Sequence, residues 1–245
     1  GRAAKEVVVA SRISDDGKSG VLVEVNCETD FVAKNENFTV FVDQILDHAS
    51  SSNTVDTLDA LLAQEFSGDA ATLDEFIKAK VGELGENMGL TRFTKYELDC
   101  EGVVGSYIHM AGRVGVLVEV KVGKADTASN DAFTTFVKNI GMHIAASQPI
   151  CIGRDEVPSE LVEAEKDIFR EQMKDKPADI IERIIDGKMG KFYATNCLLE
   201  QAFIMDTEKS IQDLVGELSK ETGDEISISR FERYGLGEAA EDGEE

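Results

Sequence analysis

The sequence predicts an α+β fold made of two related subdomains. The hexapeptide GVLVEV occurs at residues 20–25 and again at 115–120, so the copies are 115 − 20 = 95 positions apart. The same offset superposes the next apolar residues without a gap: Phe38 on Phe133, Phe41 on Phe136, Val42 on Val137 and Ile45 on Ile140. Strand, loop and helix are therefore repeated as one unit, and helices covering a small antiparallel sheet define the α+β class.

Each unit begins with two strands of a predicted hairpin. These are EVVVASRI and GVLVEV in the first unit, and GSYIHM and GVLVEV in the second, separated by turn residues. The helix that follows has apolar residues at spacings of three and four: Phe38, Phe41, Val42, Ile45, Leu46 and Ala49. A second helix containing residues 81–84 and a strand containing RFTKY at 92–96, repeated as RFERY at 230–234, close the unit.

The second unit contains an insertion. The tetrapeptide VGEL at 81–84 recurs at 215–218, an offset of 215 − 81 = 134, so 134 − 95 = 39 residues are additional. The additional residues span about 158–200, where Pro158 is typical of a helix start and Pro177 interrupts the helical pattern. Apolar stripes on both sides of the break predict two helices with a short turn. The pattern leaves two arrangements open, a projecting helical hairpin and a helical lid packed on the subdomain.

The repeat also divides the chain into segments. We expect an N-terminal core subdomain at residues 1–99 and a C-terminal core subdomain at 100–237, with the helical hairpin at 158–200 inserted in the latter. Residues 238–245 contain five acidic residues and one glycine, so we expect a disordered tail there.

Composition excludes several classes of function. The net charge is −23 with a pI of about 4.5, and such a surface repels phosphate backbones, so no direct binding of nucleic acid is expected. No stretch approaches the ~20 apolar residues of a membrane span. The four cysteines form no CxxC pair and no P-loop motif is present, so we expect neither a metal site nor a cofactor.

Catalytic motifs are also missing. The three histidines are His48, His109 and His143, and no Cys–His, Ser–His or HExxH spacing occurs near them. His48 and His143 occupy equivalent places in the repeat, where packed and hydrogen-bonded helix histidines are expected. We therefore expect no enzymatic activity. A cysteine–histidine enzyme is the weakest hypothesis, and alkylation of Cys27 or Cys151 would test it.

The segment between strand and helix differs between the two units. The first unit has Asp30 and Phe31 there, and the second has Ala125 and Asp126. Loop position alone favours a local role, in which Thr29 or Asp30 caps a turn and Phe31 enters the core. The second unit, however, forms the same elements without an aromatic residue. A phenylalanine that the fold does not need is better explained as an anchor for another molecule.

Several of these segments resemble one family. EVNCETDFVAK at residues 24–34 is similar to the signature of elongation factor Ts, the guanine-nucleotide exchange factor for elongation factor Tu. Four further segments support the resemblance: GSYIHMAGRVGVLVEV at 105–120, MHIAAS at 142–147, GKMGKF at 187–192 and RFERYGLGE at 230–238. The family has two related core subdomains, with a coiled-coil hairpin inserted in the second.

The resemblance implies a binding site for a GTPase. It implies that Thr29, Asp30 and Phe31 contact the GTPase domain of elongation factor Tu, with Phe31 as a wedge between helices near the Mg²⁺ site. This displacement would promote release of GDP and exchange for GTP. Val114 and Gly115 match an aliphatic–glycine turn that faces the partner, and His143 matches a contact histidine in MHIAAS.

The resemblance also has limits. Family members usually begin with a three-helix module, and GRAAKE at the start of this chain resembles the linker that follows it. If the module is missing, the alternative function is a module that binds or tethers the GTPase or the ribosome without exchanging nucleotide. The acidic loops resemble plastid or cyanobacterial forms more than enteric ones, so plastid stroma is the expected location and bacterial cytoplasm the alternative. The hairpin is a candidate surface for homodimer formation.

Overall fold

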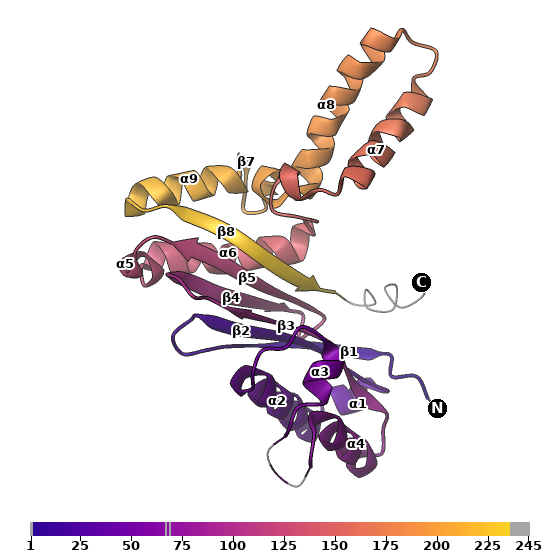
Figure 1. Cartoon of the computed structure of the whole chain (residues 1–245), viewed down its shortest axis with the longest axis vertical. Helices are drawn as coiled ribbons and strands as arrows, with labels where there is room; N and C mark the ends of the chain where they lie inside the picture. Colours follow the sequence, from indigo (N-terminus) through magenta and orange to yellow (C-terminus); the bar gives the residue numbers. More distant parts are fainter. Residues whose placement is uncertain (1, 67, 69, 236–245) are drawn as a thin grey trace.

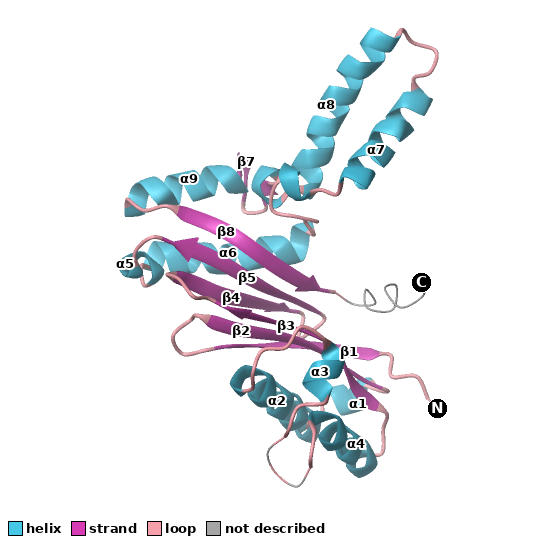
Figure 2. Ribbon diagram, in the orientation of Figure 1, coloured by secondary structure: helices cyan, strands magenta, loops and turns pink. Residues whose placement is uncertain are grey.

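The computed structural model describes residues 2–66, 68 and 70–235. The acidic tail expected at 238–245 lies outside the described residues. The α+β class is confirmed: two three-stranded antiparallel sheets and a two-stranded ribbon are combined with helices (Figure 2). Figure 1 shows the two larger sheets stacked in the middle of the molecule, with helices on the outer side of each.

The first subdomain contains the sheet with strand order β1-β2-β3. Its elements are β1 (Glu6–Ile13), β2 (Ser19–Cys27), α1 (Asp30–Ala33), α2 (Glu36–Ser51), α3 (Leu58–Leu62), α4 (Leu73–Leu84) and β3 (Met88–Glu97). Val21, Val23 and Val25 of β2 are fully buried against the apolar stripe of α2. Alternate residues of a strand lie on one face, so this face of the sheet carries the helices.

The second subdomain repeats this plan with the order β4-β5-β8. Its elements are β4 (Gly102–His109), β5 (Val114–Val122), α5 (Ala125–Ala128), α6 (Asp131–Ser147), α7 (Ser159–Gln172), α8 (Ala178–Asn196), β6 (Ala202–Phe203), β7 (Asp206–Ser210), α9 (Ile211–Thr222) and β8 (Ile226–Tyr234), with single 3-10 turns at Arg154–Glu156 and Leu198–Glu200. The strand irregularity is repeated as well. The register shifts between Glu24 and Val25 in β2, and between Glu119 and Val120 in β5.

The inner faces of the two sheets form a shared core. Leu22 of β2 and Leu117 of β5 are fully buried in it, together with Val9 and Val104. Close approach of the sheets depends on Gly115, because a Cβ atom there would lie 2.3 Å from a methyl group of Val9. The repeated glycine of GVLVEV therefore allows the two subdomains to pack against each other.

The repeated RF…Y motif joins the subdomains reciprocally. The guanidinium of Arg92 lies 4.0 Å from the ring centre of Tyr234, and that of Arg230 lies 4.0 Å from the ring centre of Tyr96. Each arginine thus stacks on the tyrosine of the other subdomain, a cation–π arrangement that is strongest where it is desolvated. Thr94 and the Tyr234 hydroxyl share a hydrogen bond of 2.6 Å across the same interface.

Each of these arginines also neutralises a buried carboxylate. Arg92 lies 3.1 Å from Glu24, and Arg230 lies 2.9 Å from Glu119. The glutamates are 1% and 3% exposed, and buried carboxylates are tolerated only when paired. The glutamate of each GVLVEV strand is therefore held by the arginine of the closing strand.

Helices α7 and α8 form an antiparallel hairpin that projects from the second subdomain (Figure 1). Met173, Ile185 and Met189 are buried between the two helices and give the hairpin its own small core. At the base of the hairpin, the backbones of Cys151 and Cys197 form an isolated parallel β-bridge, and both thiols are free. The amide of Ile150 donates a hydrogen bond to the backbone oxygen of Asn196. The hairpin is therefore not a lid packed on the subdomain.

Candidate functional site

The segment from Thr29 to Ala33 is not an open loop but one short helical turn, α1. The Thr29 side chain is its N-cap, since Oγ1 accepts a hydrogen bond from the amide of Val32 at 3.4 Å. The chain then enters α2, which begins at Glu36 with Asn35 as N-cap. Two successive caps fix the direction of the chain within a few residues.

Phe31 projects from this turn into solvent. Its side chain is 84% exposed, the highest value among the large exposed apolar residues of the described part of the chain. The local alternative, in which Phe31 enters its own core, is therefore wrong. Asp30 is exposed beside it, with a weak ion pair of 3.7 Å to Lys34. An exposed aromatic ring on a capped turn is the geometry of an anchor for a partner protein.

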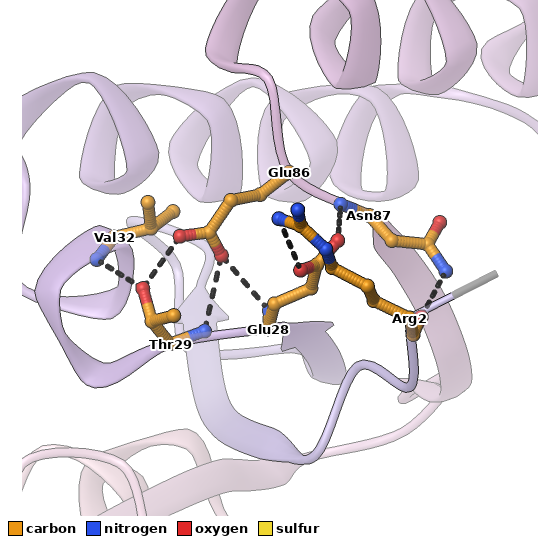
Figure 3. Close-up of polar contacts among 6 residues, drawn as sticks. All are labelled: Arg2, Glu28, Thr29, Val32, Glu86 and Asn87. Atoms are coloured by element: carbon orange, nitrogen blue, oxygen red, sulfur yellow. Dashed lines mark hydrogen bonds and ion pairs between the residues drawn. The ribbon is translucent and has the colours of Figure 1, made fainter.

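A carboxylate from a distant segment holds the start of α1 (Figure 3). Glu86 lies just after α4 and accepts hydrogen bonds from the amides of Glu28 at 3.1 Å and Thr29 at 3.0 Å. The Thr29 hydroxyl donates a third, short bond to the same carboxylate. The Thr29 oxygen is thus both donor and acceptor within the protein, which gives this half-buried residue a positioning role.

The corner between β2 and α1, at residues 28–29, and the corner between α4 and β3, at residues 86–87, also bind each other in the opposite direction. Glu28 in turn accepts a hydrogen bond from the amide of Asn87 at 2.7 Å. Arg2 forms an ion pair of 3.8 Å with Glu28, and the Asn87 side chain donates to the backbone oxygen of Arg2 at 3.2 Å (Figure 3). The strand–helix corner at 28–29 and the helix–strand corner at 86–87 are therefore tied together in both directions.

The second subdomain has the same anchor without the aromatic residue. Asp224 follows α9 as Glu86 follows α4, and it accepts bonds from the amides of Gly123 at 3.0 Å and Lys124 at 2.9 Å. The Thr127 hydroxyl donates to it at 2.7 Å, and these bonds lower the pKa of Asp224. The exposed side chain at the position of Phe31 is Asp126. One scaffold therefore carries two anchored turns, and only one presents a ring.

Val114 and Gly115 do not form a turn. They are the first residues of β5, where Val114 is half-buried and Gly115 is buried between the sheets. The turn itself lies just before them, at Met110, Ala111 and Gly112, which all have positive φ values of 51°, 55° and 101°. Met110 is 61% exposed at its tip. Ala111 and Arg113 are exposed here as well, and Met110 is the large apolar side chain at this turn that is open to a partner.

His143 is fully buried on α6. Its Nδ1 accepts a hydrogen bond from the amide of Ile204 at 3.3 Å, so Nε2 carries the proton and donates to Gln201 at 2.9 Å. Burial lowers the pKa of His143, which keeps the ring neutral. In this structure its side chain meets no surface. It instead supports the turn of the β6–β7 ribbon, where Ile204 and Met205 are exposed.

The same support occurs in the first subdomain. His48 Nε2 lies 3.1 Å from Gln64, and its ring lies beside Phe66, as that of His143 lies beside Phe203. Sequence analysis missed the matching pair Gln-x-Phe at 64–66 and 201–203, whose offset is 201 − 64 = 137. Measured at this pair, the second unit has 137 − 95 = 42 additional residues. The difference from 39 lies between this pair and VGEL.

The two cysteines proposed for the enzymatic alternative are poor nucleophiles. Burial raises the pKa of Cys27 to about 11 and that of Cys151 to about 12. Since the thiolate is the reactive form, both are protonated near neutral pH. Among the described residues, no group of three or more His, Cys, Asp or Glu side chains is placed to hold a metal ion. None of the helices described here is long and apolar enough to cross a bilayer.

Comparisons with known proteins agree with this architecture. The family profile described as Elongation factor TS matches residues 28–238. Elongation factor Ts of Trichlorobacter lovleyi is 43% identical over 244 residues, covering 98% of this chain and 78% of the relative. Elongation factor Ts of Clostridium botulinum, strain Alaska E43, is 41% identical over 247 residues, covering 100% and 79%. That of Halothermothrix orenii is 42% identical over 248 residues, covering 100% and 78%.

The family profile and these relatives, which agree with the α+β fold described above, define a translation elongation factor. The chain belongs to the elongation factor Ts family.

Proposed function

We propose that this chain binds the GDP-bound form of elongation factor Tu and promotes the release of GDP. The observation that carries the proposal is Phe31, an 84% exposed ring on a turn fixed at both ends. Family membership supplies the partner. Asp30, exposed beside the ring, is the polar part of the same contact.

The proposed mechanism needs no covalent chemistry in this chain. GDP is held in a GTPase largely by amides around its phosphates and by the coordinated Mg²⁺. If the ring of Phe31 inserts between helices beside the metal, a small displacement weakens several charge-assisted bonds to the nucleotide together. The contacts of the exchange factor stabilise the nucleotide-free state. The coupling is reciprocal, so GDP weakens the binding of this chain as the chain weakens the binding of GDP.

The site extends beyond Phe31 in this proposal. The tip of the β4–β5 turn at Met110 takes the place of Val114 and Gly115 as the partner contact, because those two residues lie inside the sheet edge. His143 acts through the Ile204–Met205 turn that it supports. Both turns present exposed apolar side chains.

The location and oligomeric state also belong to the proposal. The relatives reported above are bacterial, which supports the alternative of a bacterial cytoplasm and gives no support to the plastid stroma. Self-association through the projecting hairpin stays a prediction, which the molar mass in solution will test.

The test is a measurement of fluorescent-GDP release from elongation factor Tu of Trichlorobacter lovleyi, with and without this chain. We expect the release rate to rise with the concentration of the chain and then to saturate. No increase at any concentration would contradict exchange activity. Retention of the GTPase on immobilised chain without faster release would indicate the tethering module instead.

A further inference from the structure

We infer that Glu86 is a positioning residue for nucleotide exchange, because it fixes the turn that presents Phe31 although it lies 86 − 31 = 55 positions away in sequence. The inference rests on the proposed function of Phe31. It extends the site from the 29–31 segment to the corner between α4 and β3, a region that the sequence motif does not include.

Helix α1 is too short to be stable by itself. It contains four residues, Asp30–Ala33, and none of them is buried. A single helical turn does not persist in water, because nucleation fixes several dihedral angles for few hydrogen bonds. Val32 and Ala33 pack only partly against the core, so the geometry of α1 depends largely on its ends. At its start, the fixed points are the Thr29 cap and the three bonds that the Glu86 carboxylate accepts.

The end of α4 places Glu86 at this corner. Helix α4 ends at Leu84, and its C-cap Gly85 has a φ of 73°, the left-handed conformation that favours glycine. This C-cap turns the chain sharply, and the next side chain meets the amides at 28–29. Gly223 does the same for Asp224 at the end of α9, with a φ of 64°. Both anchors thus depend on the same helix-ending device.

The two subdomains differ at this corner. In the second, the residue equivalent to Glu28 is Gly123, which has no side chain, and Lys124 provides no side-chain cap for α5, although its Nζ donates to the backbone oxygen of Gly223 at 2.9 Å. In the first, the Glu28 side chain accepts a bond from Asn87 and Thr29 caps α1. The turn that carries the exposed ring is therefore the one that has its own threonine cap and a glutamate carboxylate bound to the opposite corner.

Positioning of the ring affects binding through entropy. A ring that is already held in its bound orientation loses less conformational freedom when the partner binds. Loss of the anchor frees the turn and moves the ring through several orientations. Glu86→Ala should therefore weaken the action of Phe31 without removing any atom of the contact.

The experiment is a double-mutant cycle on fluorescent-GDP release from elongation factor Tu. The variants are Glu86→Ala, Glu86→Gln, Phe31→Ala and the double variant, with Asp224→Ala as the matched control at the equivalent anchor. We expect Glu86→Ala to raise the concentration for half-maximal acceleration about tenfold, the loss of roughly one charge-assisted hydrogen bond. Glu86→Gln keeps one acceptor oxygen and should be intermediate.

The cycle separates the inference from the proposed function. If Glu86 acts through the ring, Glu86→Ala has no further effect in the Phe31→Ala background. If Phe31→Ala leaves exchange unchanged, the proposed function fails. If Phe31→Ala lowers exchange but Glu86→Ala does not, or lowers it equally in both backgrounds, the inference about Glu86 is overturned.

A second measurement does not use the partner. Hydrogen exchange on the chain alone should show protected amides at Glu28 and Thr29 that become exposed in Glu86→Ala. The thermal midpoints of Glu86→Ala and Asp224→Ala show whether either variant has lost its fold. Unchanged protection of both amides in a folded Glu86→Ala variant would also overturn the inference.

Discussion

The effect of removing the exposed ring can be worked out from its exposure. A phenylalanine side chain buries about 150 to 250 Å² when it is fully covered. In the free chain 84% of the residue surface is still available. At about 25 cal/mol per Å², covering that fraction would contribute about 3 to 5 kcal/mol to binding. Part of this is offset by ordering at the interface, so Phe31→Ala should cost about 2 to 4 kcal/mol, the range of a binding hot spot.

This cost corresponds to a dissociation constant about 30- to 700-fold higher. The assay is titration of each variant against nucleotide-free elongation factor Tu, together with fluorescent-GDP release. Val40→Ala is the control, since Val40 is an apolar residue of the same subdomain that is 49% exposed. The free energy of unfolding should change by less than about 0.5 kcal/mol in both variants, as is usual for exposed positions.

One result would refute the reasoning directly. If Phe31→Ala binds elongation factor Tu as tightly as Val40→Ala and releases GDP at the same rate, the exposed ring is not the anchor. A large loss of unfolding free energy in Phe31→Ala would equally contradict the structure, because a ring so exposed contributes little to folding.

Three further predictions concern stability. Gly115→Ala should lower the free energy of unfolding by about 1 to 3 kcal/mol, because the new methyl group overlaps the opposite sheet. Gly187→Ala on α8 has open space around the new methyl group and should raise the free energy of unfolding by up to about 1 kcal/mol. Urea unfolding measures both values, and a change of the opposite sign in either variant would contradict the prediction. Arg230→Met should cost about 3 to 5 kcal/mol in the same assay, since it leaves the charge of Glu119 buried without its arginine, and a loss below 1 kcal/mol would contradict this. The pKa of His143 is lowered in the folded chain, so at a pH below the ordinary histidine pKa of about 6.5 the unfolded chain binds more protons than the folded chain. The free energy of unfolding should therefore fall as the pH drops through that value. His143→Gln should reduce this slope, and an unchanged slope would argue against the assigned neutral ring.

Much of the fold was predictable because the repeated segments contain local residue patterns that specify strands and helices. The register of GVLVEV and the spacing of three and four in the following helix are properties of neighbouring residues. They gave the strands, the first helix of each unit and the place of the insertion. The turn at 30–33 was not predicted as a helix, since its N-cap and anchor depend on a carboxylate from another element.

The candidate site was only partly predictable. The exposure of Phe31 could be inferred because the second unit forms the same corner with Asp126. The packing of His143 was predicted from its place in the repeat, and the Gln-x-Phe pair beside both histidines is a further sequence signal for it. The role of Glu86 could not, because Glu86 and Asp224 are different residues at an offset of 224 − 86 = 138 and carry no motif.

The amino-acid pattern was enough to predict a doubled strand–helix unit and an insertion in its second copy, and it places an aromatic residue in only one of the two corners. These features follow from the periodic spacing of apolar residues or from comparing the two units, so they can be read without a structure. The tertiary structure alone decided that the two sheets stack through their glycines, that the insertion projects, and that residues 86 and 29 meet. Such contacts join segments far apart in the chain, and their geometry follows from packing and backbone direction rather than from local pattern.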